Sequence, residues 1–433
     1  MSPPDFTLET FQNEYLPVGG REVNAILTVT SAVAADPRTA PADAAEIVII
    51  DCSGSMGGSK IVEAKQATAV ALDAIRDGVA FAVVEGTGTA AEVYPGHGRL
   101  ATASRGTIQE AKRAVRRLEA HDGTAIGTWL RLARQIFGTG RATLRHAILL
   151  TDGHNGEGSG KLEEAIGLCK GVFTCDCRGV GTGWNPSELR KIATALLGSL
   201  DIVPEPSGLA ADFGAMMTAA MGKDVADVLL RVRTPQHARV RFVKQTAPVA
   251  DDLTGRRVDA GPQASDYPTG AWGQESRDYH LCVEIDSAPV GEEMLAARVS
   301  LVCSSPSGPE VLGQGLIKAR WTEDEELSTR INDRVAHALG QTELAEVIQV
   351  GLAARKAGDQ ETATAKLGRA VALAHESGNE DTARLLAKVV DVVDPVTGTV
   401  RPKTRVSDVD EMTLDVRSSK TVRKDPDGSQ PGG

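Results

Sequence analysis

Three oxygen-bearing side chains follow a predicted buried strand, spaced two residues apart. They are Asp51, Ser53 and Ser55, and they come directly after Ile47–Ile50, a run of β-branched residues without a polar position. Such a run is typical of a strand that is covered on both faces within a parallel sheet. Carboxylate and hydroxyl oxygens are the donors that hard divalent cations such as Mg²⁺ prefer. Because open α/β sheets bind ligands beyond the carboxyl ends of their strands, we expect a divalent metal here.

Two later segments offer further oxygen donors, and we expect both at the same edge of the sheet. The loop His121–Gly127 carries Thr124 and leads into a predicted helix, and the strand that ends at Leu150 runs into Asp152. Mg²⁺ takes about six oxygen ligands, and water fills the positions that the protein leaves open. A few protein donors from three segments are therefore sufficient for a metal site.

Together these donors resemble the metal-ion-dependent adhesion site (MIDAS) of von Willebrand factor type A (VWA) domains. Every position of the five-residue pattern is filled, by Asp51, Ser53, Ser55, Thr124 and Asp152. The resemblance covers residues 44–222 and is specific, because three separated motifs occur in the right order at predicted strand ends. It implies that the serines and the threonine bind the metal directly or after a small rearrangement. The aspartates would bind directly or through water.

The resemblance also implies a function. Five ligands of which only two are carboxylates leave Mg²⁺ incompletely neutralised, so an acidic group of a protein partner would take the remaining coordination position. We therefore expect a Mg²⁺-dependent protein-interaction module that binds an exposed Asp or Glu, with Mn²⁺ or Ca²⁺ as alternative ions. The whole chain resembles cytosolic bacterial VWA proteins, which act as scaffolds.

Two other uses of the same residues stay open at this stage. Asp51 and Asp152 could form a two-carboxylate Mg²⁺ site for a phosphohydrolase. However, position 53 is Ser where an aspartyl-phosphate enzyme would carry a second Asp, and Ser55 lies in no GxSxG motif. The glycine-rich stretch before Lys161 lacks the spacing of a phosphate-binding loop. We therefore expect no enzyme. The third possibility is a metal that only stabilises the fold.

The elements around the five residues alternate between strands and helices. Strands are predicted at Ile47–Ile50, Phe81–Val84, Ala147–Leu150 and Phe173–Val180, with helices between them and an edge strand near Glu92–Tyr94. This alternation predicts a doubly wound parallel sheet with helices on both faces over residues 44–222.

The pattern of apolar and polar residues changes several times in the rest of the chain. Residues 223–320 contain short alternating segments typical of an antiparallel β-sandwich, and residues 1–43 share this pattern. The α/β domain would then be inserted within the sandwich. Residues 321–394 are predicted to form a helical bundle, and the polar residues 395–433 a disordered tail.

Charge and composition exclude several classes of protein. The 433 residues carry 47 Lys and Arg against 58 Asp and Glu, for a net charge of −11, which argues against nucleic-acid binding. The N-terminus shows no leader pattern and no 18-residue apolar segment occurs, so we expect no membrane contact and a cytoplasmic location. The sequence does not indicate an oligomeric state.

Cysteine and tryptophan positions suggest no second site. The six cysteines are too sparse for a disulfide framework, and Cys175 with Cys177 lacks the further ligands of a zinc site. Trp129 is predicted to belong to the core. Trp184, within a Gly- and Pro-containing turn, is predicted to be exposed near the metal face.

Overall fold

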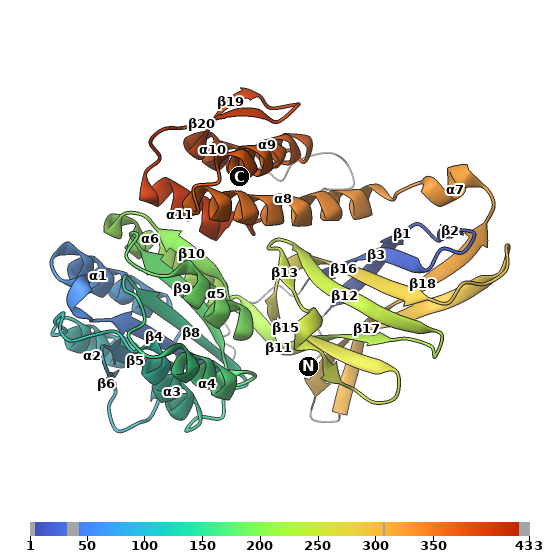
Figure 1. The fold of residues 1–433 in the computed structure, drawn as a ribbon. Helices are drawn as coiled ribbons and strands as arrows, with labels where there is room; N and C mark the ends of the chain where they lie inside the picture. Colours follow the sequence, from blue (N-terminus) through green and yellow to red (C-terminus); the bar gives the residue numbers. More distant parts are fainter. Residues whose placement is uncertain (1–4, 33–42, 306–307, 424–433) are drawn as a thin grey trace. The chain divides into compact units, whose positions relative to one another are not determined.

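The computed structural model describes residues 5–32, 43–305 and 308–423. Within these ranges the chain divides into two compact units. We call residues 43–226 with 270–273 the α/β unit, and residues 5–32, 227–269 and 274–423 the sandwich unit. Each unit is built around its own β-sheets (Figure 1).

The α/β unit is built on a sheet with the strand order β10-β9-β8-β4-β5-β6, and β7 also pairs with β5. Strands β4, β5, β8, β9 and β10 are parallel, whereas β6 and β7 run antiparallel to β5. The strands are β4 (Ala44–Asp51), β5 (Ala80–Gly86), β6 (Ala90–Tyr94), β7 (Ala101–Thr102), β8 (Leu144–Thr151), β9 (Thr174–Val180) and β10 (Leu200–Val203). All eight residues of β4 are buried, which explains the unbroken apolar run Ile47–Ile50 within it. The predicted α/β fold with a parallel sheet is confirmed.

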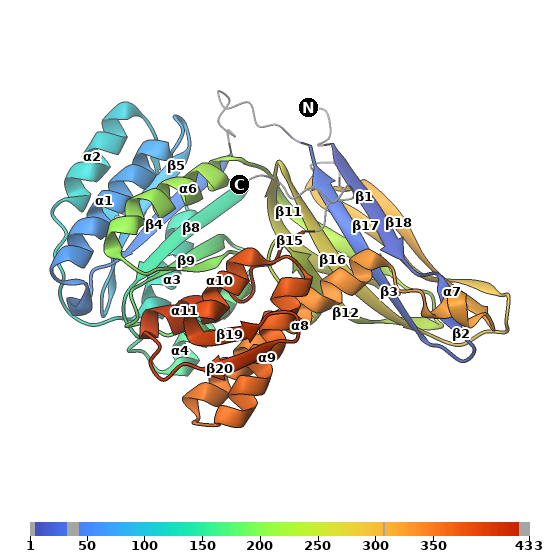
Figure 2. The same ribbon diagram turned by 90° about the horizontal axis from the view of Figure 1, so that it is seen from above.

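Helices cover both faces of this sheet (Figure 2). They are α1 (Ser59–Ala74), α2 (Arg105–Val115), α3 (Ile126–Phe137), α4 (Ser159–Cys169), α5 (Pro186–Ala195) and α6 (Leu209–Met221). Helices α1, α2 and α6 share one core with the side chains of Val48, Ile50 and Ile148. Because side chains alternate along a strand, Ile47 and Ile49 are buried on the opposite face, where α3 packs against β4 and β5.

The sandwich unit contains two mainly antiparallel sheets, with strand orders β1-β3-β16-β12-β13 and β14-β15-β11-β17-β18-β2. The strands are β1 (Phe6–Gln12), β2 (Tyr15–Pro17), β3 (Glu22–Ser31), β11 (Lys223–Arg233), β12 (Ala238–Ala247), β13 (Asp251–Asp252), β14 (Val258–Asp259), β15 (Ala264–Gly273), β16 (Glu275–Ile285), β17 (Glu293–Ser305) and β18 (Gly308–Thr322). Strand β3 pairs with β16, and β2 pairs in parallel with β18. The N-terminal strands thus complete both sheets, and the α/β unit interrupts the sandwich between β3 and β11.

Helices follow the last strand of the sandwich. They are α7 (Glu325–Thr329), α8 (Asp333–Lys356), α9 (Gln360–Glu376), α10 (Glu380–Val389) and α11 (Asp408–Arg417), with the hairpin of β19 (Val390–Asp394) and β20 (Thr399–Pro402) before α11. Gly358 and Gly378 have φ of +80° and +67°, so the turns between the long helices use the left-handed region. The side chains of Asp359 and Asn379 then cap α9 and α10.

The prediction of a disordered tail over residues 395–433 is wrong for its described part. Strand β20 and helix α11 lie within it, and the Ser407 side chain caps α11. Leu414 and Val416 are buried, so two apolar side chains anchor a segment whose average composition is polar. Residues 424–433 lie outside the described residues.

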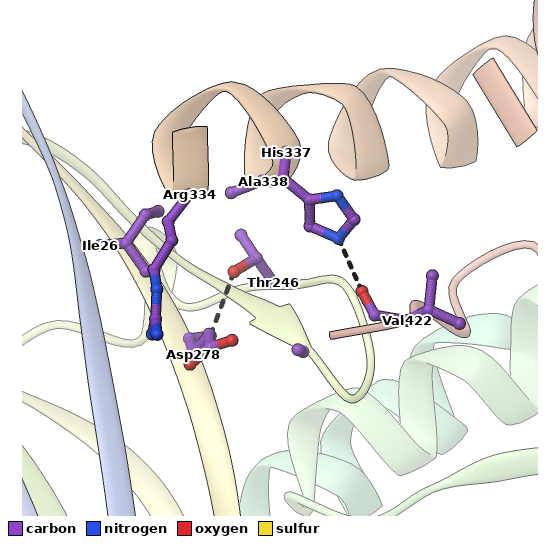
Figure 3. A pocket seen from close by; sticks show the side chains of 8 residues that line it. Ile26, Thr246, Asp278, Arg334, His337, Ala338 and Val422 are labelled. Atoms are coloured by element: carbon purple, nitrogen blue, oxygen red, sulfur yellow. Dashed lines mark hydrogen bonds between the residues drawn. The ribbon is translucent and has the colours of Figure 1, made fainter. Parts of the chain in front are cut away.

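The segment after α11 binds to the sandwich. The Ala250 amide donates to the Ser419 carbonyl at 2.7 Å, and the Thr421 amide donates to the Pro248 carbonyl at 3.0 Å. Beside this segment, α8 and β12 enclose a small pocket in which His337 Nε2 lies 2.8 Å from the Val422 carbonyl (Figure 3). The polar groups of the pocket bind neighbouring protein groups, since the Thr246 hydroxyl donates to the Asp278 carbonyl and Arg334 donates to the Thr28 hydroxyl. The pocket therefore belongs to the packing of the C-terminal segment.

No helix in the described part of the chain is long and apolar enough to cross a membrane.

Candidate metal centre

Asp51 lies at the carboxyl end of β4, with 0% of its surface exposed. The Ser53 amide donates to Asp51 Oδ1 at 2.7 Å, and the Thr151 hydroxyl donates to Oδ2 at 2.5 Å. Burial raises the pKa of the Asp51 carboxyl. The two hydrogen bonds lower this pKa, whereas the nearby Asp152 carboxylate raises it further. The carboxylate is thus held in one orientation by neighbours from β8 and from its own turn.

The two serines lie in the turn that follows Asp51 and contains a short 3₁₀ helix, Gly54–Met56. The hydroxyl oxygens of Ser53 and Ser55 are 3.0 Å apart. The Ser55 hydroxyl donates to Asp152 Oδ1 at 2.6 Å, across a separation of 97 residues in the sequence. This turn therefore meets the end of β8, as the pairing of β4 with β8 requires.

Thr124 faces the same point from the loop before α3. A Cβ atom on Gly153 would lie 3.1 Å from the Thr124 hydroxyl oxygen and 3.2 Å from that of Ser55. The Ser53 hydroxyl oxygen would be 3.9 Å away. Three hydroxyl groups thus surround the space that glycine leaves open beside Asp152.

Backbone hydrogen bonds hold the Thr124 loop against the Asp51 turn. The Gly54 amide donates to the Asp122 carbonyl at 3.0 Å, and the His121 amide donates to the Cys52 carbonyl at 2.7 Å. Asp122 has φ of +61°, so this loop contains a residue in the left-handed region. The structure therefore brings together all five residues that the sequence singled out.

Lys60 is a charged neighbour that sequence reasoning missed. It lies in the first turn of α1, and its ammonium forms an ion pair with Asp152 Oδ2. The Lys60 side chain is 34% exposed, whereas that of Asp152 is fully buried. The helix predicted between the strands Ile47–Ile50 and Phe81–Val84 was the one signal that placed Lys60 close to the serine turn.

Asn155 and Glu157 were missed as well. They lie in the loop after Asp152, and their side chains accept hydrogen bonds from the amides of Ile126 and Gly127 at 3.0 and 2.6 Å. In the same contact the Gly156 amide donates to the Thr124 carbonyl at 2.7 Å. We call this set of three hydrogen bonds the α3 clasp. It caps a helix whose own N-cap residue, Ala125, offers no side-chain acceptor.

The tryptophan predictions had different outcomes. Trp129 is fully buried, and its ring nitrogen donates to the Thr87 carbonyl at 2.8 Å, as expected for a core residue that fixes α3 on β5. Trp184 is 2% exposed, so the prediction of an exposed Trp184 is wrong. Its ring lies over Gly179, where a Cβ atom would come within 1.8 Å of the indole.

The donor set favours a hard cation. Two carboxylates and three hydroxyls are oxygen donors of the kind that Mg²⁺, Mn²⁺ and Ca²⁺ accept. Within the described ranges, no group of three or more His, Cys, Asp or Glu side chains is placed to hold a metal ion. The six cysteines are buried and form no disulfide. A metal at this centre would depend on its hydroxyl groups.

Comparisons with known proteins identify the family. Residues 45–202 match the model of the von Willebrand factor type A domain, and residues 372–418 match that of the von Willebrand factor type A C-terminal domain. A solved structure described as von Willebrand factor type A from Catenulispora acidiphila is 51% identical, covers 97% of each chain and has a TM-score of 0.92. The chain belongs to the von Willebrand factor type A family. Domains of this family commonly mediate metal-dependent interactions with other proteins.

More distant structures share the fold alone. The ArnB paralog VWA2 from Sulfolobus acidocaldarius is 14% identical, with a TM-score of 0.59 over 96% of this chain and 99% of that one. The human COPII-coat protein Sec24c is 9% identical, with a TM-score of 0.52 over 88% of this chain and 58% of that one. No curated protein matches the sequence.

Proposed function

We propose that Asp51, Ser53, Ser55, Thr124 and Asp152 form a complete MIDAS. The observation that carries this proposal is the convergence of three hydroxyl groups beside Asp152, which is joined to the serine turn by the Ser55 hydrogen bond of 2.6 Å. The five donors come from three loops at the carboxyl edge of one parallel sheet. Such an edge is where folds of this class bind ligands.

The bound ion is Mg²⁺, with Mn²⁺ or Ca²⁺ as alternatives. The formal charges of two carboxylates equal the charge of a divalent ion. The three hydroxyl donors add no further negative charge. The remaining coordination position is therefore attractive to an anionic oxygen from outside the chain. The ion would supply this attraction, while the protein residues hold it at the sheet edge.

The external ligand is an Asp or Glu side chain on a partner protein. Access is favourable because Ser55, Asp122 and His154 are exposed around the two buried aspartates. A folded partner with a protruding carboxylate could reach such a centre, and the sandwich unit would act as scaffold. We expect the protein to work in a bacterial cytoplasm without contact with nucleic acid.

A binding role is favoured over phosphate-ester hydrolysis. Both oxygens of Asp51 accept hydrogen bonds, from the Ser53 amide and the Thr151 hydroxyl, which suits a fixed ligand better than a nucleophile. Ser occupies position 53, where an aspartyl-phosphate enzyme would carry a second Asp.

Metal titration by calorimetry tests the proposal. Asp51→Asn should abolish Mg²⁺ binding, and the double variant Ser53→Ala, Ser55→Ala should weaken it strongly. Asp77→Asn is the matched control, because Asp77 is exposed and lies before β5, at the opposite end of the sheet. Equal Mg²⁺ affinity in the native protein and Asp51→Asn would show that the metal binds elsewhere.

Capture of partners from a lysate then tests the interaction. The native protein should retain its partners in Mg²⁺ and lose them in chelator, and Asp51→Asn should retain none in either condition. Identical sets of captured proteins in all four samples would reject metal-dependent recognition.

A further inference from the structure

We propose that Lys60 neutralises Asp152 within the metal centre. This neutralisation lowers the affinity of the centre for its metal and raises its affinity for the acidic group of a partner. This inference rests on the proposed function. It assigns to Lys60 the role of a residue that sets the balance between metal and carboxylate binding.

Lys60 occupies one side of the Asp152 carboxylate. Its ammonium pairs with Oδ2 and lies 3.5 Å from the Ser55 carbonyl oxygen, while the Ser55 hydroxyl donates to Oδ1. The Ser55 hydroxyl of the proposed MIDAS thus lies on the Oδ1 side, and the Ser53 hydroxyl oxygen is 3.0 Å from it. A metal held by those hydroxyls and the Lys60 ammonium therefore need not exclude each other.

The position of Lys60 argues against a purely structural role in α1. A cation in the first turn of a helix faces the positive end of the helix dipole, which is unfavourable. Helix α1 has no acidic residue in its first turn, and its N-cap residue Gly58 provides no side-chain cap. An acidic or neutral residue at position 60 would interact more favourably with the N-terminus of α1. The favourable partner of Lys60 is Asp152, 92 residues away in the sequence.

Among the described residues, no cation pairs with Asp51 as Lys60 pairs with Asp152. The oxygens of Asp51 are bound by an amide and a hydroxyl, both uncharged donors. The described part of the centre therefore contains one carboxylate without a cationic partner, Asp51, and one carboxylate that is paired with Lys60, Asp152. With a divalent ion bound, the groups Asp51, Asp152 and Lys60 leave one net positive charge, whereas without Lys60 the centre would be neutral.

Electrostatics then predicts two opposite effects. The ammonium repels a metal ion bound a few ångströms away, and it attracts an incoming carboxylate. Solvent screening reduces both effects because the Lys60 side chain is partly exposed. Changes of about tenfold in each dissociation constant are the expected size for such a partly screened charge.

The test compares Lys60→Met, which keeps the aliphatic stem and removes the charge, with Lys60→Arg, which keeps the charge. Calorimetry measures the Kd for Mg²⁺ on the full chain. Fluorescence anisotropy at saturating Mg²⁺ measures binding of a labelled peptide that carries one Glu among neutral residues. Lys65→Met is the control, because Lys65 lies on the same helix and donates to the Arg116 carbonyl away from the metal centre.

Lys60→Met should bind Mg²⁺ about tenfold more tightly and the peptide about tenfold more weakly, whereas Lys60→Arg and Lys65→Met should resemble the native protein. Thermal unfolding without metal checks that each variant folds. Unchanged constants in Lys60→Met, or weaker Mg²⁺ binding, would overturn the role of Lys60 while leaving the proposed function intact. A native protein that binds no Mg²⁺ would overturn both.

Discussion

The backbone amide of Gly127 donates to the Glu157 carboxylate at 2.6 Å, so a residue from the loop after β8 caps the helix that follows Thr124. This bond is the strongest part of the α3 clasp, because a carboxylate interacts favourably with the positive end of a helix dipole. Glu157 also lies 3.9 Å from Arg131 on the same helix. The clasp therefore joins the loop of Asp152 to the loop of Thr124.

Removing the Glu157 carboxylate should loosen this connection. We expect Glu157→Ala to lower the free energy of unfolding by about 1–2 kcal/mol, the usual cost of losing a helix cap with its charge. Amide hydrogen exchange should become faster over residues 122–127, and Mg²⁺ affinity should fall because Thr124 is less well positioned. Glu163→Ala is the control, since Glu163 lies on α4 and forms an exposed ion pair with Lys191. Unchanged exchange in the Thr124 loop would contradict the role of the clasp.

Gly153 offers a test that leaves all five donors in place. Its backbone does not lie in the left-handed region, so Ala causes no backbone strain there. The new Cβ atom would come within 3.1 Å of the Thr124 hydroxyl oxygen and 3.2 Å of that of Ser55, which forces these groups apart. We expect Gly153→Ala to weaken Mg²⁺ binding severalfold in calorimetry, with a change in unfolding free energy below about 1 kcal/mol. Gly160→Ala, with no atom within 4 Å of its Cβ position, should leave Mg²⁺ affinity unchanged. Equal affinity in the two variants would show that the hydroxyl groups are not metal ligands.

His146 links three neighbouring strands far from the metal centre. Its Nδ1 lies 2.7 Å from Glu46 and its Nε2 lies 3.0 Å from Asp176. Burial alone lowers the pKa of His146, but the two carboxylates outweigh it and raise the pKa to about 10. Burial also opposes ionisation of Asp176, yet the charge and hydrogen bond of His146 hold the pKa of Asp176 below its usual range.

The raised pKa of His146 predicts how stability depends on pH. The protonated ring stabilises the fold fully below its ordinary pKa of 6.5, and this contribution is lost as the pH rises through about 10. At pH 7 we expect His146→Gln to lower the unfolding free energy by about 3 kcal/mol, because the buried Glu46 and the half-buried Asp176 lose their cation. Urea unfolding of native protein and variant at several pH values measures this difference. The difference in unfolding free energy between the native protein and His146→Gln should shrink toward pH 10. The control is His375→Gln, because His375 is exposed, and this variant should have the unfolding free energy of the native protein at every pH. A difference that grows with pH would contradict a protonated His146.

Most of the α/β unit could be predicted from the sequence because its signals are local. The apolar run Ile47–Ile50 indicates a fully buried strand, and the helices predicted between Phe81–Val84 and Ala147–Leu150 are present as α2 and α3. Parallel pairing then brings the ends of β4 and β8 together, which is why the sequence alone indicates that Asp51 and Asp152 lie close together.

Long-range contacts could not be predicted in the same way. The Lys60 ion pair depends on a residue distant in the sequence, and a lysine near a helix start usually points into solvent. Trp184 is buried because Gly179 leaves room for its ring, which the surrounding Gly- and Pro-containing turn did not indicate. The C-terminal segment is polar on average, so its composition predicted disorder. The few apolar residues that anchor α11, such as Leu414, are too few to change that average.

The segment after α11 can be tested by two truncations. Its hydrogen bonds to the sandwich and to α8 involve Ala250 with Ser419, Thr421 with Pro248 and Thr246, and Val422 with His337. A chain that ends at Arg417 loses all four of them, and we expect its unfolding free energy to fall by about 4 kcal/mol, near 1 kcal/mol for each hydrogen bond to a half-buried group. A chain that ends at Arg423 keeps them and should unfold like the native protein. Thermal unfolding, with hydrogen exchange of β12 as a local measure, distinguishes the two. Equal stability of both truncated chains would show that the segment rests on the sandwich without stabilising it.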